Sequence, residues 1–223
     1  MGCPRRAGLR DRLGGRRSQF HPGVDDTAFA RSLGIPAGAR VLLSPRQWNA
    51  NSNVASIIAA HAQLDSNVYL IVKSFPGRGG DALDEAERAI ERSPAGERIR
   101  TVGDVDASML PSMYASAEVV ISTCGTDGTP VSVLEAMAAG RYVIALKDAS
   151  LAEWVAEPGG RLVETPAPDA IARAVKAFLD DPEAAGRATE HSSAVIAARA
   201  DRETEFRRMG EIYDRLVEQR AIR

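Results

Sequence analysis

The chain has 223 residues, of which 44% are hydrophobic, 5% aromatic and 26% charged, with a formal net charge of −2. This length suits one domain, and the composition is that of a folded globular protein rather than a disordered chain. The acidic balance argues against nucleic-acid binding, and no stretch approaches the roughly 18 apolar residues of a membrane span.

The amino-terminal segment differs in charge from the rest of the chain. Residues 1–17 contain six Arg and one Asp, which leaves 22 basic and 29 acidic side chains elsewhere. We predict that residues 1–20 form a flexible, Arg-rich head, because a segment with this charge tends to stay solvated and disordered. The segment also lacks the continuous apolar run of a secretory signal. Peripheral contact with acidic lipid is the alternative. Cys3 and Cys124 lie far apart and define no disulfide framework, which favours a reducing cytoplasm.

From about residue 41 the sequence alternates short apolar runs with helical patterns. This alternation is typical of βαβ units, which build a parallel sheet. Most runs are apolar on both faces, so we expect helices on both sides of the sheet. The predicted strands are 41–43, 68–72, 99–102, 119–121, 142–146 and 161–164, and the helices between them are 53–63, 81–93, 108–117, 130–139 and 151–156. The sequence therefore predicts an α/β domain with a doubly wound parallel sheet over residues 21–200.

Extra helices follow the sixth predicted strand. Pro168 opens a helix that runs to about Leu179, and Asp181-Pro182 precedes the next one. The last segment, 201–223, is predicted to be an amphipathic helix. Its apolar stripe consists of Phe206, Met209, Ile212, Tyr213, Leu216 and Val217. We expect this stripe to need a partner surface.

The segment 122–140 follows a buried strand and carries the strongest functional signal. Thr129 is a good N-cap, Pro130 suits the first helical position, and Gly140 suits the carboxyl end of the helix. A helix that starts at the carboxyl edge of a parallel sheet offers backbone N–H groups and partial positive charge to an anion. Gly125 and Gly128 let the backbone approach such a ligand. A diphosphate fits this description.

Two carboxylates flank the start of the same helix. Asp127 stands just before it and Glu135 lies within it, so one can face the sugar and the other the ribose of a nucleotide-sugar. A Gly-rich turn, a capped helix and two acids also describe many structural strand-to-helix junctions. The spacing alone leaves both interpretations open.

The run from Asp127 to Gly140 resembles the signature of the family-four retaining glycosyltransferases of GT-B architecture. In that signature two acidic residues with seven positions between them flank a Gly-x-Pro turn. The first acid is usually Glu and is Asp127 here, whereas Glu135 is followed by the familiar Ala-Met-Ala-Ala-Gly. Segments 21–25, 102–105, 113–117, 152–155 and 160–163 also fit, so the resemblance covers roughly residues 20–180. It implies a Rossmann-like, nucleotide-sugar-binding domain, the carboxyl-terminal half of such an enzyme.

The resemblance also implies roles for individual residues. Arg46 would pair with the diphosphate and Asp127 would hold the sugar, so these two would be catalytic. The other implied contacts are Gly128, Thr129 and Pro130 at the sugar, the N–H groups of Val131 and Ser132 at phosphate, Glu135 at the ribose and the backbone near Val105 at the base. No metal or other cofactor is implied. The sugar would pass to an acceptor with retained stereochemistry while cation and helix dipole stabilise the departing nucleotide diphosphate.

The chain departs from the family pattern in its cations. The family usually has a Lys five or six residues after the strand-end Arg, where this chain has Asn51 and Ser52. Asn51 can donate hydrogen bonds to the donor but brings no charge, which predicts weaker leaving-group stabilisation. Lys73 ends the second strand. We interpret it as an exposed strand-end residue, the alternative being that it reaches the site from another side.

The resemblance leaves out the amino-terminal half, which would hold the acceptor. We expect that half in cis or in trans, with the chain being a truncated product, a fragment or one part of a split enzyme. The alternative functions are a non-catalytic nucleotide-sugar-binding subunit, a degenerate remnant, and a sugar epimerase of the same architecture.

Other chemistry-bearing residues receive structural interpretations. Asp104-Val105-Asp106 resembles a divalent-metal motif, but its place between a strand and a helix favours turn and cap duty. The three His show no shared metal-ligand spacing, and His61 is interpreted as a surface residue at a helix end. Cys124 has no His near it in sequence and is not expected to be a nucleophile.

Overall fold

A six-stranded parallel sheet forms the centre of the computed structural model, which describes residues 19–25, 27–74, 80–126, 130–200 and 202–221. The strands are Arg40–Ser44 (β1), Val68–Lys73 (β2), Ile99–Val102 (β3), Val119–Ser122 (β4), Tyr142–Leu146 (β5) and Gly160–Val163 (β6). Each lies within two residues of a predicted strand, because each is a short apolar run that can be buried on both faces. The predicted α/β class and doubly wound parallel sheet are confirmed.

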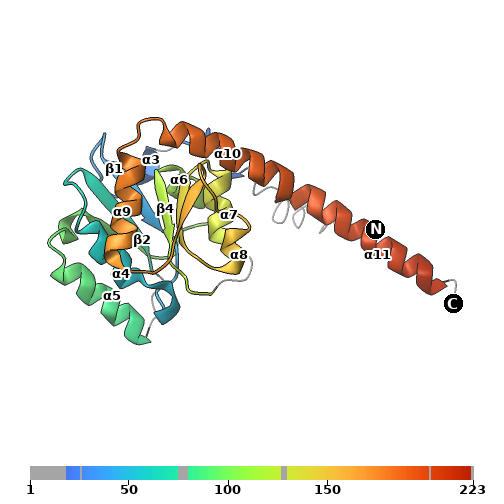
Figure 1. The fold of residues 1–223 in the computed structure, drawn as a ribbon, viewed down its shortest axis with the longest axis horizontal. Helices are drawn as coiled ribbons and strands as arrows, with labels where there is room; N and C mark the ends of the chain where they lie inside the picture. Colours follow the sequence, from blue (N-terminus) through green and yellow to red (C-terminus); the bar gives the residue numbers. More distant parts are fainter. Residues whose placement is uncertain (1–18, 26, 75–79, 127–129, 201, 222–223) are drawn as a thin grey trace, which may run out of the picture.

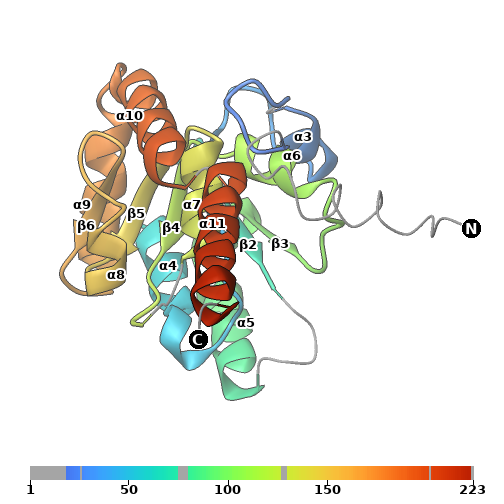
Figure 2. The same ribbon diagram turned by 90° about the vertical axis from the view of Figure 1, so that its right-hand side faces the viewer.

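Helices alternate with the strands along the chain. The α-helices are Ala28–Ser32 (α3), Val54–His61 (α4), Gly80–Arg92 (α5), Leu110–Ala115 (α6), Val131–Ala138 (α7), Ala149–Ala152 (α8), Pro168–Leu179 (α9), Ala184–Arg199 (α10) and Arg202–Ala221 (α11), and the 3₁₀ turns are Ala50–Ser52 (η1) and Gly96–Arg98 (η2). Figure 2 shows the sheet from β6 on one side of the molecule to β3 on the other. The sheet separates two hydrophobic cores. Helices α4, α5 and α9 contribute to the first core, and α3, α6, α7 and α8 to the second.

The strand order is β3-β2-β1-β4-β5-β6. The chain therefore builds outward from β1 to β3 and then returns to the other side of β1 with β4. Loops that follow β1 and β4 leave the sheet in opposite directions at this reversal, which opens a crevice at the carboxyl ends of the two strands. The order places the loop at residues 45–49 beside the segment that leads into α7.

The ends of α7 show local sequence signals at work. Gly140 follows the helix with a φ of 73°, a left-handed conformation that glycine adopts without steric cost. Its N–H donates to Met137 O (3.0 Å) and the next N–H, of Arg141, donates to Ala136 O (2.9 Å), so the predicted helix end is confirmed. At the other end, Pro130 occupies the cap position and the helix begins at Val131, one residue later than predicted.

Two side chains lie deeper than the sequence indicated. The interpretation of His61 as a surface residue is wrong: it is 1% exposed, and its Nε2 donates to Val68 O across 2.9 Å, because the end of α4 packs over the start of β2. Phe20, assigned to the predicted head, lies in the second core. Its ring meets Tyr114 edge-on, with 5.5 Å between centroids, so the folded body includes Phe20.

Helix α11 extends away from the rest of the molecule (Figure 1). It has the predicted amphipathic pattern, and all six apolar side chains of its stripe are at least 43% exposed. A contiguous exposed apolar surface usually marks an interaction site. Within the described residues, no helix combines the length and apolar character needed to cross a membrane.

Candidate functional site

A cavity of about 380 Å³ lies at the carboxyl edge of the sheet, beside the reversal in strand order. Its walls come from the loop after β1, the end of β2, and helices α6 and α7. The lining residues are Pro45, Arg46, Gln47, Asn49, Ser52, Lys73, Leu110, Met113, Tyr114, Val131, Ser132 and Glu135. Of the residues predicted for the site, the structure brings together Arg46, Val131, Ser132 and Glu135 here.

Arg46 is held over the start of α7. Its Nη1 donates a hydrogen bond of 3.2 Å to Oγ of Ser132. The loop that carries Arg46 is anchored by Trp48, which is 2% exposed and packs in the first core. Because Arg46 is only two residues from this anchor, its guanidinium projects from a fixed base. A guanidinium at this place can bind phosphate oxygens with paired donors.

The first turn of α7 adds backbone donors to the same wall. The intrahelical bonds of this turn start at the N–H groups of Val133 and Leu134, which donate to Pro130 O across 2.9 and 3.0 Å. The N–H groups of Val131 and Ser132 precede them and have no acceptor inside the helix, as expected at a helix start. The helix dipole places partial positive charge at this end. Together with Arg46, this turn forms a site suited to an anion.

Lys73 and Glu135 line the same cavity from two different elements, β2 and α7. Lys73 ends β2, and Glu135 lies on α7 about one turn after Ser132. Burial lowers the pKa of Lys73, while the carboxylates of Asp104 and Glu135 act in the opposite direction. The ammonium is therefore partly shielded from water and interacts electrostatically with both carboxylates. The interpretation of Lys73 as an exposed strand-end residue is wrong, because its side chain is half-buried in the cavity wall.

Asn51 connects the two loops that meet at the reversal instead of lining the cavity. Its Nδ2 donates to Thr126 O (3.1 Å) and approaches the sulfur of Cys124 at 3.1 Å. Its Oδ1 accepts from the N–H of Gly125 across 3.1 Å. A Cβ on Gly125 would lie 2.7 Å from that oxygen. The close approach at Gly125 in this structure is that of Asn51, and the approach of a ligand to Gly125 stays a prediction.

The neighbouring residues strengthen this connection. Asn53 adopts a left-handed φ of 52°, and its Nδ2 donates to Thr123 O across 2.7 Å. The hydroxyl of Thr123 in turn donates to Ser52 O across 2.9 Å. Asn49 caps η1 by accepting from the N–H of Asn51 (3.0 Å). These contacts hold the loop after β1 against the loop after β4, and so hold Arg46 relative to α7.

The structure does not test the roles of the other predicted site residues. Asp127, Gly128 and Thr129 fall outside the described residues, and Pro130 is buried. The sugar-binding role of this turn, Pro130 included, stays a prediction. Val105 lies in the loop after β3, and its side chain packs on the second core. Its role at the base also stays a prediction.

The Asp104-Val105-Asp106 segment shows the expected turn chemistry. Asp106 accepts from the N–H (2.8 Å) and the hydroxyl (2.6 Å) of Ser108, which lowers the pKa of its carboxyl. The turn and cap duty predicted for this motif is confirmed at Asp106. Over the described ranges, no group of three or more His, Cys, Asp and Glu side chains is arranged to hold a metal ion.

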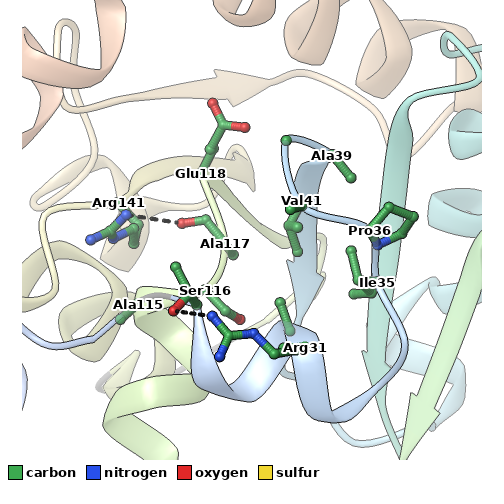
Figure 3. A pocket seen from close by; sticks show the side chains of 14 residues that line it. Arg31, Ile35, Pro36, Ala39, Val41, Ala115, Ser116, Ala117, Glu118 and Arg141 are labelled. Atoms are coloured by element: carbon green, nitrogen blue, oxygen red, sulfur yellow. Dashed lines mark hydrogen bonds between the residues drawn. The ribbon is translucent and has the colours of Figure 1, made fainter.

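A second cavity, of about 360 Å³, lies at the opposite edge of the sheet (Figure 3). It is bounded by the residues that precede β1, β4 and β5. Its two arginines are engaged within the protein, because Arg141 donates to Ala139 O (2.8 Å) and Ala117 O (3.3 Å), and Arg31 to the hydroxyl of Thr27 (3.3 Å). Glu118 pairs with Arg40 across 2.6 Å. The only helix start among the described residues that line it belongs to the short helix α3, whose N-cap is Thr27, and the cavity lies away from the crevice at the carboxyl ends of the strands that favours ligand binding.

Comparisons with known proteins match the chain to a family model and to curated sequences. The family model described as glycosyl transferases group 1 matches residues 25–194. D-inositol 3-phosphate glycosyltransferase 2 of Catenulispora acidiphila is 30% identical over 94% of this chain and 53% of its own length. The chain spans about half the length of the curated relatives it matches.

Solved structures show the same fold. Anabaena HepE, crystallised with UDP and glucose, superposes with a TM-score of 0.81 at 20% identity, over 90% of this chain and 55% of that one. The carboxyl-terminal domain of a group 1 glycosyl transferase from Francisella tularensis superposes with a TM-score of 0.72 at 19% identity. That match covers 84% of this chain and 98% of the Francisella domain.

Proposed function

Because the chain belongs to the glycosyl transferases group 1 family, we propose that it binds a nucleotide-diphosphate sugar and transfers the sugar to an acceptor with retained stereochemistry. One observation carries the donor site: Arg46, the start of α7 at Val131 and Ser132, and the Glu135 carboxylate line a single cavity. Arg46 and the start of α7 suit a diphosphate, and the Glu135 carboxylate suits the hydroxyl pair of a ribose.

The proposed reaction uses the cavity to stabilise the leaving group. As the bond from the anomeric carbon to the diphosphate oxygen breaks, negative charge grows on the diphosphate. The guanidinium of Arg46 and the dipole of α7 are already in place beside it, so little reorganisation is needed. Asp127 and the turn through Pro130 are proposed to hold the sugar, and the backbone near Val105 the base. The proposal includes no metal ion, because cationic side chains and a helix start at the cavity contribute positive charge.

We propose that the leaving group of the donor is a nucleoside diphosphate. Anabaena HepE, which has the same fold, was solved with UDP and glucose. The acceptor is proposed to be held by a second half, in the same polypeptide or in a separate one, because the curated relatives are about twice as long as the matched region. The exposed apolar stripe of α11 supports this proposal by offering a surface for that half to bury.

A non-catalytic nucleotide-sugar-binding subunit, or a degenerate remnant, is the second candidate. It is favoured by the position of Asn51, whose amide is used to join two loops at a place where the family usually has a Lys. Sugar transfer measured with an amino-terminal half supplied in trans separates the two candidates. Transfer from the donor that the chain binds supports the enzyme, and binding without transfer supports the subunit.

Calorimetric titration with UDP, GDP, ADP and CDP tests the donor site. We expect one nucleotide to bind the wild-type chain, and Arg46→Ala and Glu135→Ala each to weaken it at least tenfold, about 1.4 kcal/mol. Lys147→Ala is the control, because Lys147 follows β5 at the same edge but pairs with Glu164 outside the cavity (2.7 Å). If no nucleotide binds a correctly folded wild-type chain, the proposed donor site is wrong.

A further inference from the structure

Lys73 occupies a position that sheet register brings to the cavity. Strands β1 and β2 are parallel, and Ser44 pairs with Val72. Lys73 is the next and last residue of β2. It therefore lies at the level of Pro45, one residue before Arg46. The two cations therefore project from adjacent strand ends into the same space, although they are far apart in sequence.

The charges around the cavity set the environment of Lys73. Among the described residues that line the cavity, the acidic and basic side chains are Arg46, Lys73 and Glu135. Asp104, at the carboxyl end of the neighbouring strand β3, also acts on Lys73. The two carboxylates favour the charged ammonium and burial opposes it. The side chain is thus a cation at the wall of a partly desolvated space, where its attraction to an anion is stronger than in bulk water.

A diphosphate carries more than one negative charge, whereas Arg46 supplies a single positive charge. The loop after β1 offers no second cation, because the lining residues after Arg46 are Gln47, Asn49 and Ser52. The start of α7 contributes a dipole but no full charge. An ammonium is a compact point charge on a flexible stem and can follow phosphate oxygens that a fixed guanidinium does not reach.

We propose that Lys73 is the second cationic contact for the diphosphate of the nucleotide ligand, acting from the end of β2 beside Arg46. This inference rests on the proposed function, since it deepens the assignment of the same cavity. It gives the donor site two full positive charges from two adjacent strands. It also compensates, from a different strand, for the uncharged residues at positions 51 and 52.

The alternative role for Lys73 is to neutralise Glu135 within the protein. The two roles differ in what the side chain must provide. An anion contact needs a positive charge that can reach phosphate, so Lys73→Arg retains function and Lys73→Met does not. If Lys73 only packs against its neighbours or positions Glu135, one of two results is expected. Either the affinity for a nucleoside diphosphate does not depend on the charge at position 73, or Lys73→Arg is as defective as Lys73→Met.

Calorimetric titration of the full chain with UDP, GDP, ADP and CDP tests this inference, using whichever binds the wild type most tightly. We expect Lys73→Met to weaken binding at least fivefold, and Lys73→Arg to stay within about threefold of the wild type. We also expect a shallower salt dependence for Lys73→Met, because one ionic contact is lost. Lys147→Met is the matched control, since it removes the same charge from the same sheet edge outside the cavity.

The outcomes separate this inference from the proposed function. A loss of less than fivefold in Lys73→Met, or an equal loss in Lys73→Arg, overturns the role of Lys73 while leaving the donor site in place. A wild-type chain that binds none of the four nucleotides overturns the donor site and the role of Lys73 with it. Circular dichroism of each variant establishes that the fold is retained.

Discussion

The guanidinium of Arg46 donates a hydrogen bond to the hydroxyl of Ser132 across 3.2 Å, joining the loop after β1 to the first turn of α7. The two residues come from opposite sides of the reversal in strand order. Their contact directs the cation toward the helix start before any ligand arrives. This hydrogen bond therefore orients one guanidinium of the proposed anion site within the protein itself.

Removal of this contact should weaken donor binding. In Ser132→Ala the guanidinium loses its hydroxyl acceptor, and we expect nucleoside diphosphate affinity to fall about twofold to tenfold, the worth of one hydrogen bond. A double-mutant cycle with Arg46→Ala, measured by calorimetry, should be non-additive because the two residues act together. Ser108→Ala is the control, since Ser108 bonds only to the exposed turn at Asp106 in the described residues. Additive losses would mean that Ser132 does not act through Arg46.

Glu135 should recognise the ribose hydroxyls. Its carboxylate accepts hydrogen bonds more strongly than a neutral amide does. We expect Glu135→Gln to weaken the binding of the ribonucleoside diphosphate severalfold. The binding of the 2′-deoxy form should remain nearly unchanged. Competition binding with the two ligands measures this ratio, and Glu164→Gln serves as the control because Glu164 lies beside Lys147 on the outer surface. Equal losses for both ligands would place Glu135 away from the ribose.

The connection between Asn51 and Gly125 should be visible in stability. We expect Gly125→Ala to lower the free energy of unfolding by about 1–2 kcal/mol, because the new Cβ meets Asn51 Oδ1 at 2.7 Å. The same change should cost less in an Asn51→Ala background, where that oxygen is gone. Urea unfolding of the two single variants and the double variant gives the coupling. Gly186→Ala is the control, since nothing lies within 4 Å of its added Cβ, and it should be neutral or stabilising.

Burial of His61 should make stability depend on pH. Burial lowers the pKa of His61 from 6.5 to about 4, while its hydrogen bond to Val68 O opposes the shift. The unfolded chain therefore binds a proton that the folded chain rejects between these two values. Its contribution to stability is complete above pH 6.5 and is lost as pH falls toward 4. We expect a loss of about 2 kcal/mol between pH 7.5 and pH 5.

Urea unfolding at the two pH values measures this effect. His61→Gln should be less stable than the wild type at pH 7.5 and should lose clearly less on going to pH 5. His21→Gln, at an exposed position, should retain the wild-type pH dependence. If the wild type and His61→Gln lose stability equally, the pH dependence comes from other groups.

Local patterns in the sequence predicted most of the fold. Each strand is an apolar run short enough to be recognised alone, and α7 carries its own end signal in Gly140, whose left-handed φ serves the turn. The predicted site residues Arg46, Val131, Ser132 and Glu135 also come together. They do so because parallel strands present their carboxyl ends at one edge, a consequence of the βαβ pattern itself.

The tertiary structure decided what depends on strand order and register. Lys73 ends β2 in the sequence, but only the pairing of Ser44 with Val72 places it beside Arg46. Asn51 has the hydrogen-bonding groups of a ligand contact, yet its amide is taken by a loop that follows another strand. His61 ends a helix, and its burial depends on how α4 packs over β2. The sequence by itself therefore determined the elements and the edge at which the site lies, because those signals are local, whereas partners distant along the chain were determined by packing.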